Sequence, residues 1–190
     1  MTRFFSFHKE YFDNNGDQGN LSVLKFFLGQ QSVSFDEVSE LASADFVLVG
    51  DASRAALREY GKEFLDLAPA LQARHANGLP TLVIGSSYEL LASEVDWLET
   101  PKRGSVVSEF RTLVTDEAGP VLGYRNSSIL DLDFVRSGDF IATTLFGPIL
   151  AKNPTLLDQM LLACGGTSAD WEPKMKNWVE SIRELAPTHH

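Results

Sequence analysis

The sequence predicts an α/β fold of three layers, in which helices cover both faces of a mostly parallel central sheet. Short apolar runs typical of buried strands alternate along the chain with segments of helical periodicity, which is the pattern of parallel α/β sheets. Two runs, 46–50 and 81–84, are almost wholly apolar, as expected for strands covered on both faces. The length of 190 residues predicts one domain, 1–190, large enough to bury a sizeable core.

The elements of the N-terminal part follow in order. A strand is predicted at 4–7, and a loop rich in Gly, Asn and Asp at 13–20 leads from it into a helix with leucines on one side. A short alternating run at 33–35 predicts the second strand, and the apolar run 46–50 predicts the third.

The middle of the chain predicts one long helix, then a strand and a turn. Apolar residues recur at spacings of three and four across 57–71, which indicates an amphipathic helix, and 78–80 ends it. The strand that follows ends at Gly85, and Ser86 or Ser87 is expected to cap the next helix.

The C-terminal half alternates extended and helical segments. Apolar pairs within 92–120 predict extended structure, with an antiparallel arm as one form of it, and further strands are expected at 121–124 and 140–146. Asn153 is expected to cap a helix that has Pro154 in its first turn, where a missing N–H costs nothing. The last amphipathic helix is predicted at about 171–186, with 187–190 as a tail.

Composition excludes several classes of function. The net charge of −10 disfavours nucleic-acid binding, which relies on Lys and Arg to neutralise phosphates. No apolar run has the roughly 20 residues needed to cross a bilayer, and no signal-peptide pattern is visible, so we expect a cytoplasmic protein without a membrane partner. The single cysteine, Cys164, is interpreted as a small buried hydrophobe. No cofactor fingerprint or metal-ligand spacing is present, so neither a cofactor nor a metal is expected.

Five separated stretches resemble, in the right order, the class I glutamine amidotransferases of the cobyric-acid-synthase type. Within that family the similarity is greatest to the small glutaminase subunit that amidates peptidoglycan lipid II. The resemblance implies a flavodoxin-like, class I glutamine amidotransferase fold. The most specific stretches are Gly16-Asp17-Gln18-Gly19-Asn20 and Gly147-Pro148-Ile149-Leu150 followed by Asn153-Pro154. The others are Phe46-Val47-Leu48-Val49-Gly50, the strand and turn from Leu82 to Leu91, and Gly123-Tyr124-Arg125-Asn126-Ser127.

The departures from the family pattern fall where its chemistry should be. Gly85 stands at the position of the nucleophilic cysteine, and Phe146 at that of the histidine base. Glutaminase action needs a thiolate, a proton carrier and backbone N–H donors for the oxyanion, so these replacements imply lost catalysis. Glycine would also relieve the backbone strain typical of nucleophile turns. The resemblance places the former oxyanion and pocket region at six further residues: Gly50, Asp51, Ser86, Ser87, Tyr88 and Asn126.

The leading hypothesis is therefore a catalytically inactive glutaminase-like protein that binds or regulates a partner. The resemblance implies a ligase or synthetase partner, first of all a Mur-ligase-like subunit; a homo-oligomer is the other possibility. One alternative is a hydrolase or transferase that uses Ser86, Ser87 or an acidic pair in the old cleft, although only half of the Gly-x-Ser-x-Gly elbow of serine hydrolases is present. Another is a small-molecule sensor. Phe146 packed onto Gly85 would favour partner binding, whereas an open polar cleft would favour the alternatives.

Overall fold

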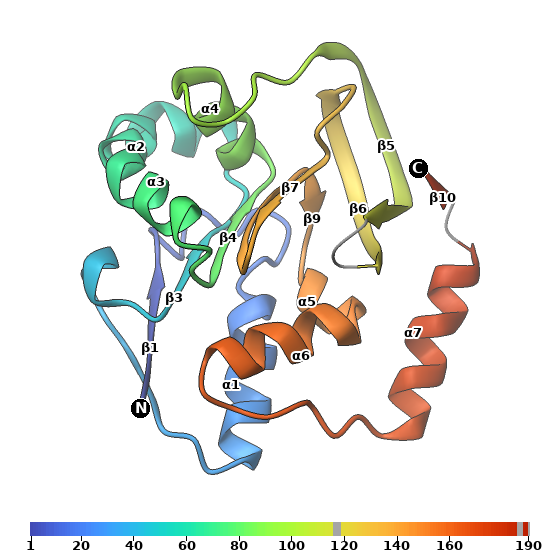
Figure 1. Cartoon of the computed structure of the whole chain (residues 1–190). Coiled ribbons are helices and arrows are strands. Elements are labelled where there is room, and N and C mark those ends of the chain that lie inside the picture. Colours follow the sequence, from blue (N-terminus) through green and yellow to red (C-terminus); the bar gives the residue numbers. More distant parts are fainter. Residues whose placement is uncertain (116–118, 186–187, 190) are drawn as a thin grey trace.

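A central sheet forms the middle of the structure, which is a computed structural model that describes residues 1–115, 119–185 and 188–189 (Figure 1). Within these residues six strands lie in the order β2-β1-β3-β4-β8-β7, and all are parallel except β7, which pairs antiparallel with β8 at the edge. This order is that of flavodoxin-like doubly wound sheets. The strands are β1 (Thr2–Ser6), β2 (Phe35–Glu37), β3 (Phe46–Val49), β4 (Thr81–Ile84), β7 (Phe134–Ser137) and β8 (Phe140–Thr143).

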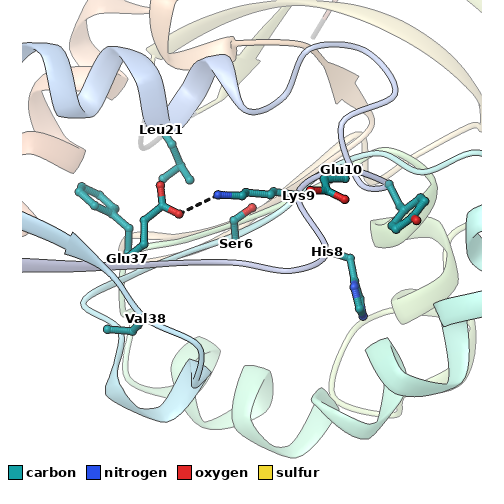
Figure 2. A pocket seen from close by; sticks show the side chains of 9 residues that line it. Ser6, His8, Lys9, Glu10, Leu21, Glu37 and Val38 are labelled. Atoms are coloured by element: carbon teal, nitrogen blue, oxygen red, sulfur yellow. Dashed lines mark hydrogen bonds and ion pairs between the residues drawn. The ribbon is translucent and has the colours of Figure 1, made fainter.

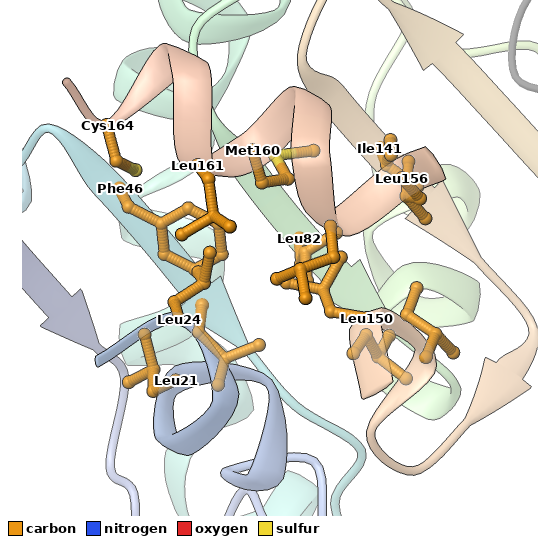
Figure 3. Close-up of a cluster of buried hydrophobic side chains, with 14 of the residues drawn as sticks. Leu21, Leu24, Phe46, Leu82, Ile141, Leu150, Leu156, Met160, Leu161 and Cys164 are labelled. Atoms are coloured by element: carbon orange, nitrogen blue, oxygen red, sulfur yellow. The ribbon is translucent and has the colours of Figure 1, made fainter. Parts of the chain in front are cut away.

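Helices cover both faces of this sheet, which confirms the predicted three-layer α/β class. Alternate strand residues point to opposite faces, so Leu48 and Leu82 join one apolar cluster while Val47 and Val83 join the other. Figure 3 shows the first cluster, where helices pack on the sheet through Leu24 and Met160 among others. That face carries α1 (Gly19–Gln30), α5 (Ile149–Lys152), α6 (Pro154–Ala163) and the buried Val179 of α7 (Pro173–Leu185). The other carries α2 (Arg54–Asp66), α3 (Ala68–Ala76) and α4 (Ser86–Glu94), and a short 3-10 turn, η1 (Leu41–Ser43), lies before β3.

The prediction of one helix across 57–71 is wrong. The chain forms α2 and α3, and Leu67 is both the C-terminal cap of the first and the N-terminal cap of the second. Pro69 lies in the first turn of α3. Proline has no N–H and its ring would clash with the preceding turn, so it can begin a helix but cannot continue one.

Asn153 holds the predicted position before α6, but its side chain does not cap the helix. Its Oδ1 accepts the N–H of Leu122 at 2.7 Å, and its Nδ2 donates to the carbonyl oxygens of Leu122 at 2.8 Å and Ile149 at 2.7 Å. The amide therefore joins α5 and α6 to the strand that contains Leu122. Buried backbone N–H and C=O groups need hydrogen-bond partners, and the Asn153 side chain supplies them here instead of at the helix end.

A second sheet forms the arm expected within 92–120. Strands β5 (Arg103–Thr115) and β6 (Gly119–Ile129) pair antiparallel over most of their length, and residues 116–118 lie outside the described part. The short strand β10 (Thr188–His189) pairs with β5, in the segment expected to be a tail. The second strand of the chain is predicted at 33–35, but β2 begins at Phe35 and ends at Glu37.

The strand predicted at 140–146 is divided between the two sheets. Its first half is β8, whereas β9 (Leu145–Phe146) pairs antiparallel with β6, so that Phe146 lies opposite Tyr124. Thr144 lies between them, and its Oγ1 donates to the Asp133 carboxylate at 2.6 Å. The chain thus leaves the main sheet just where the parallel strands end. Among the described residues, no helix is both long and apolar enough to cross a bilayer.

Candidate functional site

Gly85 forms the sharp turn between β4 and α4. Its backbone has φ 64° and ψ −129°, a conformation that glycine adopts freely and other residues adopt only with strain. Its N–H donates to the Thr143 carbonyl at 2.8 Å, and its carbonyl accepts the N–H of Glu89 at 3.0 Å. The turn is therefore tied to the neighbouring strand on one side and to the helix on the other.

The ring of Phe146 occupies the space where a side chain at position 85 would lie. A β-carbon added to Gly85 would overlap Phe146 Cε1, would lie 2.8 Å from Cδ1, and would lie 2.6 Å from Asp51 Oδ1. The ring itself is buried, with 6% of its residue surface exposed. Strand β9 and the loop after β3 thus close over the turn, and residue 85 has no room for a nucleophile.

The Asp51 carboxylate binds the N-terminus of α4. Its Oδ1 accepts the N–H of Ser86 at 2.8 Å, and its Oδ2 accepts from the side-chain amides of Asn14 at 3.1 Å and Asn15 at 2.7 Å. A negative group is favourable here, because helix N-termini carry unpaired N–H donors and partial positive charge. In nucleophile turns, the N–H after the nucleophile is the one that stabilises the oxyanion. In this chain the N–H of the residue after Gly85 is bound to the Asp51 carboxylate.

The expectation that Ser86 or Ser87 caps α4 is wrong. Both lie inside the helix, and its N-terminal cap is Gly85. Ser86 Oγ donates to the Ala52 carbonyl at 2.8 Å and accepts its N–H at 3.1 Å, whereas Ser87 Oγ donates to the Gly50 carbonyl at 2.7 Å. These hydroxyls tie the loop after β3 to the helix, and in the described residues neither of them hydrogen-bonds a histidine.

Asp17 joins the two stretches that carry the most specific resemblance. Its carboxylate accepts the N–H groups of Asp51 at 2.7 Å and Gly147 at 2.8 Å. Burial of this side chain, which has no exposed surface, raises the pKa of Asp17 to about 6, because the charged form loses water. Asn20 continues the link, since its Oδ1 accepts the N–H of Leu150 at 3.0 Å. Sequence reasoning placed Asp17 in a specific motif but did not assign it this central position.

Lys152 lies beside this cluster. Its Nζ donates to the Phe146 carbonyl at 3.2 Å, and burial lowers the pKa of its ammonium although Asp17 opposes the shift. The ammonium thereby links α5 to β9.

The remaining predicted residues are structural in this arrangement. Gly50 has no room for a β-carbon, which would lie 3.0 Å from the Asp17 β-carbon and overlap the Phe12 carbonyl. Tyr88 is buried, and its hydroxyl donates to the Leu132 carbonyl at 2.8 Å. Asn126 is exposed on β6 and accepts from Ser108 Oγ at 2.6 Å, so it belongs to the arm and not to the turn.

Gly85 and Phe146 line none of five pockets found on the described residues. Those residues also contain no group of three or more His, Cys, Asp or Glu side chains that could hold a metal ion. Cys164 is buried between α6 and the following loop, where burial raises the pKa of its thiol to about 12. It therefore packs as an unreactive small side chain, as expected.

Among the comparisons with known proteins, only the one with solved structures finds similar chains. No family model matches the chain, and no curated protein matches it. One similar solved structure is that of a glutamine amidotransferase from Thermotoga maritima. The two are 13% identical, and the alignment covers 97% of this chain and 83% of that one with a TM-score of 0.46.

Proposed function

We propose that this chain is a glutamine amidotransferase-like protein that has lost glutaminase chemistry and acts as a binding or regulatory subunit of a ligase or synthetase. The observation that carries the proposal is the packing of Phe146 onto Gly85, with the Asp51 carboxylate bound to the adjacent N–H of Ser86.

Three requirements of glutamine hydrolysis are unmet together at this turn. Gly85 has no nucleophilic atom, Phe146 cannot carry a proton, and the Ser86 N–H already binds an anion. Loss of the nucleophile or of the base alone commonly lowers turnover by roughly 10^4 to 10^6. With all three absent, no acyl-enzyme can form at this position.

The same geometry disfavours the serine-type and sensor alternatives. A serine nucleophile needs a base within hydrogen-bond reach and an open cleft. Ser86 and Ser87 instead donate to backbone carbonyls, and the aromatic ring fills the space above the turn. Contact with a partner protein needs neither feature.

The partner class is inferred from the resemblance of the sequence motifs. Members of that family deliver ammonia to a synthetase or ligase, and the glutaminase of the peptidoglycan-amidating complex pairs with a Mur-ligase-like subunit. Such a ligase is therefore the partner to test first, and it would use free ammonia or another amine.

The test combines an activity assay with a binding assay. Purified protein incubated with glutamine should release no glutamate above a buffer control. The protein should also co-purify with a Mur-ligase-like subunit from the same genome, and should change that subunit's rate when ammonium chloride is the nitrogen source. Sustained glutamate release would refute the loss of chemistry. Glutaminase inactivity without any ligase binding or rate change would leave the fold interpretation intact but overturn the proposed partner.

A further inference from the structure

A pocket of about 430 Å³ lies between the loop after β1 and the first turns of α2. Strands β1 and β3 are neighbours in the sheet (Figure 1). The helix after β1, α1, packs on one face and the helix after β3, α2, packs on the other, so the loops that follow the two strands lead to opposite faces. A crevice at the carboxyl ends of two such strands is where doubly wound sheets bind ligands. The volume is within the range of small-molecule sites.

Aromatic rings form part of the wall. Tyr11 and Tyr60 line the pocket, with their ring centroids 4.9 Å apart. His8 stacks on Tyr60 at 4.4 Å, and its Nε2 lies 2.9 Å from the Glu63 carboxylate. Tyr60 is thus packed between the rings of His8 and Tyr11.

The charged residues that line the pocket are all carboxylates. Glu10, Asp13 and Glu59 all line the pocket, and none of its nine lining residues is Lys or Arg. Asp13 Oδ1 accepts the N–H of Gln18 at 2.8 Å, whereas in the described part of the chain no ion pair is formed by Glu59. The pocket therefore combines negative charge with aromatic surface and lacks a cation of its own.

The chain satisfies the same combination internally in the adjacent region. Lys25 Nζ lies 2.6 Å from Glu37 Oε1, and 5.6 Å and 6.0 Å from the ring centroids of Phe4 and Phe35. Lys9 Nζ bonds the other oxygen of Glu37 at 2.9 Å, as the dashed line in Figure 2 shows. There the Lys25 ammonium lies between a carboxylate and aromatic rings. The pocket beside α2 has the carboxylates and the rings but no ammonium among its nine lining residues.

We propose that the pocket lined by Tyr11, Tyr60, Glu10 and Glu59 binds an organic cation, either a small free amine or guanidine or the corresponding side chain of a peptide. The carboxylates supply the charge and the ring faces supply cation–π attraction. Asn14 also lines the pocket and donates to Asp51 Oδ2 at 3.1 Å, and Asp51 in turn accepts the N–H of Ser86, so these two side chains connect the pocket to the turn at Gly85. This site is independent of the proposed function, because it requires neither a ligase nor the loss of glutaminase chemistry.

The test compares a cation with its uncharged isostere. Choline and 3,3-dimethylbutan-1-ol have the same shape but differ in charge, and binding is measured by titration calorimetry at low salt. We expect choline to bind about threefold to tenfold more tightly than the alcohol. Butylammonium and ethylguanidinium extend the series, and a blocked lysine tripeptide tests whether a peptide side chain binds better than the free cations.

Variants assign the binding to this pocket. Tyr60→Leu and Glu59→Gln should each weaken choline binding about threefold to tenfold, whereas Tyr60→Phe should keep most of it because the ring remains. Glu184→Gln, an exposed carboxylate on α7, removes the same charge elsewhere and should have no such effect. Thermal unfolding of each variant checks that the fold is retained. Equal affinity for choline and the alcohol, no binding of any of the four cationic probes at tens of millimolar, or equal loss in Glu184→Gln would overturn the proposal.

Discussion

Phe146 and Gly85 are matched to each other: the ring lies where a β-carbon of residue 85 would be, and its Cδ1 would be only 2.8 Å from that carbon. They come from β9 in the second sheet and from the end of β4 in the first. The identity of either residue therefore constrains the other, and a side chain at position 85 should cost less stability when residue 146 is smaller.

A double-mutant cycle should measure this coupling. Gly85→Ala is expected to lower the free energy of unfolding by roughly 3 kcal/mol, because the positive φ and the overlap both add strain. In a Phe146→Ala background the added cost should fall to that of backbone strain plus the remaining close contact with Asp51 Oδ1 at 2.6 Å. Gly16→Ala is the matched control, since its φ is +76° but its β-carbon would meet nothing within 4 Å. Additive costs in the cycle, measured by urea unfolding, would contradict the contact.

A cysteine placed at the turn should report the charge of Asp51. In a Gly85→Cys, Phe146→Ala, Cys164→Ala protein, the nearby carboxylate should raise the pKa of the new thiol, because two negative groups repel. Adding Asp51→Asn should lower that pKa by about one pH unit or more. The pH dependence of iodoacetamide labelling measures both values. Identical profiles with and without Asp51→Asn would show that the carboxylate does not face residue 85.

Asp17 should make the folded chain less stable as the pH rises, whereas most carboxyl groups of folded proteins have the opposite effect. Its pKa is about 6 in the folded chain, against an ordinary value near 4, so between these pH values the folded chain holds a proton that the unfolded chain has released. The free energy of unfolding should therefore fall as the pH rises through this window, by up to about 3 kcal/mol from this group. Urea unfolding of wild type and Asp17→Asn between pH 4 and 7 isolates the contribution. If the free energy of unfolding of Asp17→Asn changed with pH as steeply as that of wild type, Asp17 would not be the source of the dependence.

The stability of the arm formed by β5 and β6 should depend on one buried cluster of charged side chains. Asp133 accepts from Arg125 Nε, Arg111 Nη1 and Thr144 Oγ1 at 2.7, 2.7 and 2.6 Å, and Arg125 is almost fully buried. Asp133→Ala would remove the carboxylate that pairs with the buried Arg125 and would leave Arg111 with Glu109, so it should cost about 3 to 5 kcal/mol. Asp131→Ala, which loses an ion pair with the exposed Lys102, should cost about 1 kcal/mol or less. Similar losses for the two variants would mean that the cluster does not hold the arm.

The sequence predicted the elements that depend on local pattern. Buried strands such as 46–50 and 81–84 are visible as apolar runs, and the turn at Gly85 follows from where one of them ends. The division at Pro69 could have been predicted too, because a proline inside a periodic helix is a local signal.

Contacts made by polar side chains were not predictable in the same way. Nothing in the sequence pairs Asp51 with the Ser86 N–H, 35 residues away, or Asp17 with Gly147, 130 residues away. Ser86 and Asn153 look like helix caps by residue type, yet each bonds a different backbone segment that tertiary packing brings close. Residue type indicates what a side chain can bind, and only the fold decides which partner is in reach.

The most direct test of the central claim is the release of glutamate from isotopically labelled glutamine, followed by NMR over several hours with micromolar protein. The account predicts no glutamate above the rate of the buffer control, alone or together with a Mur-ligase-like subunit. Release that scales with protein concentration, follows the protein through size exclusion, and is abolished by Ser86→Ala or Ser87→Ala would show that the turn still carries chemistry.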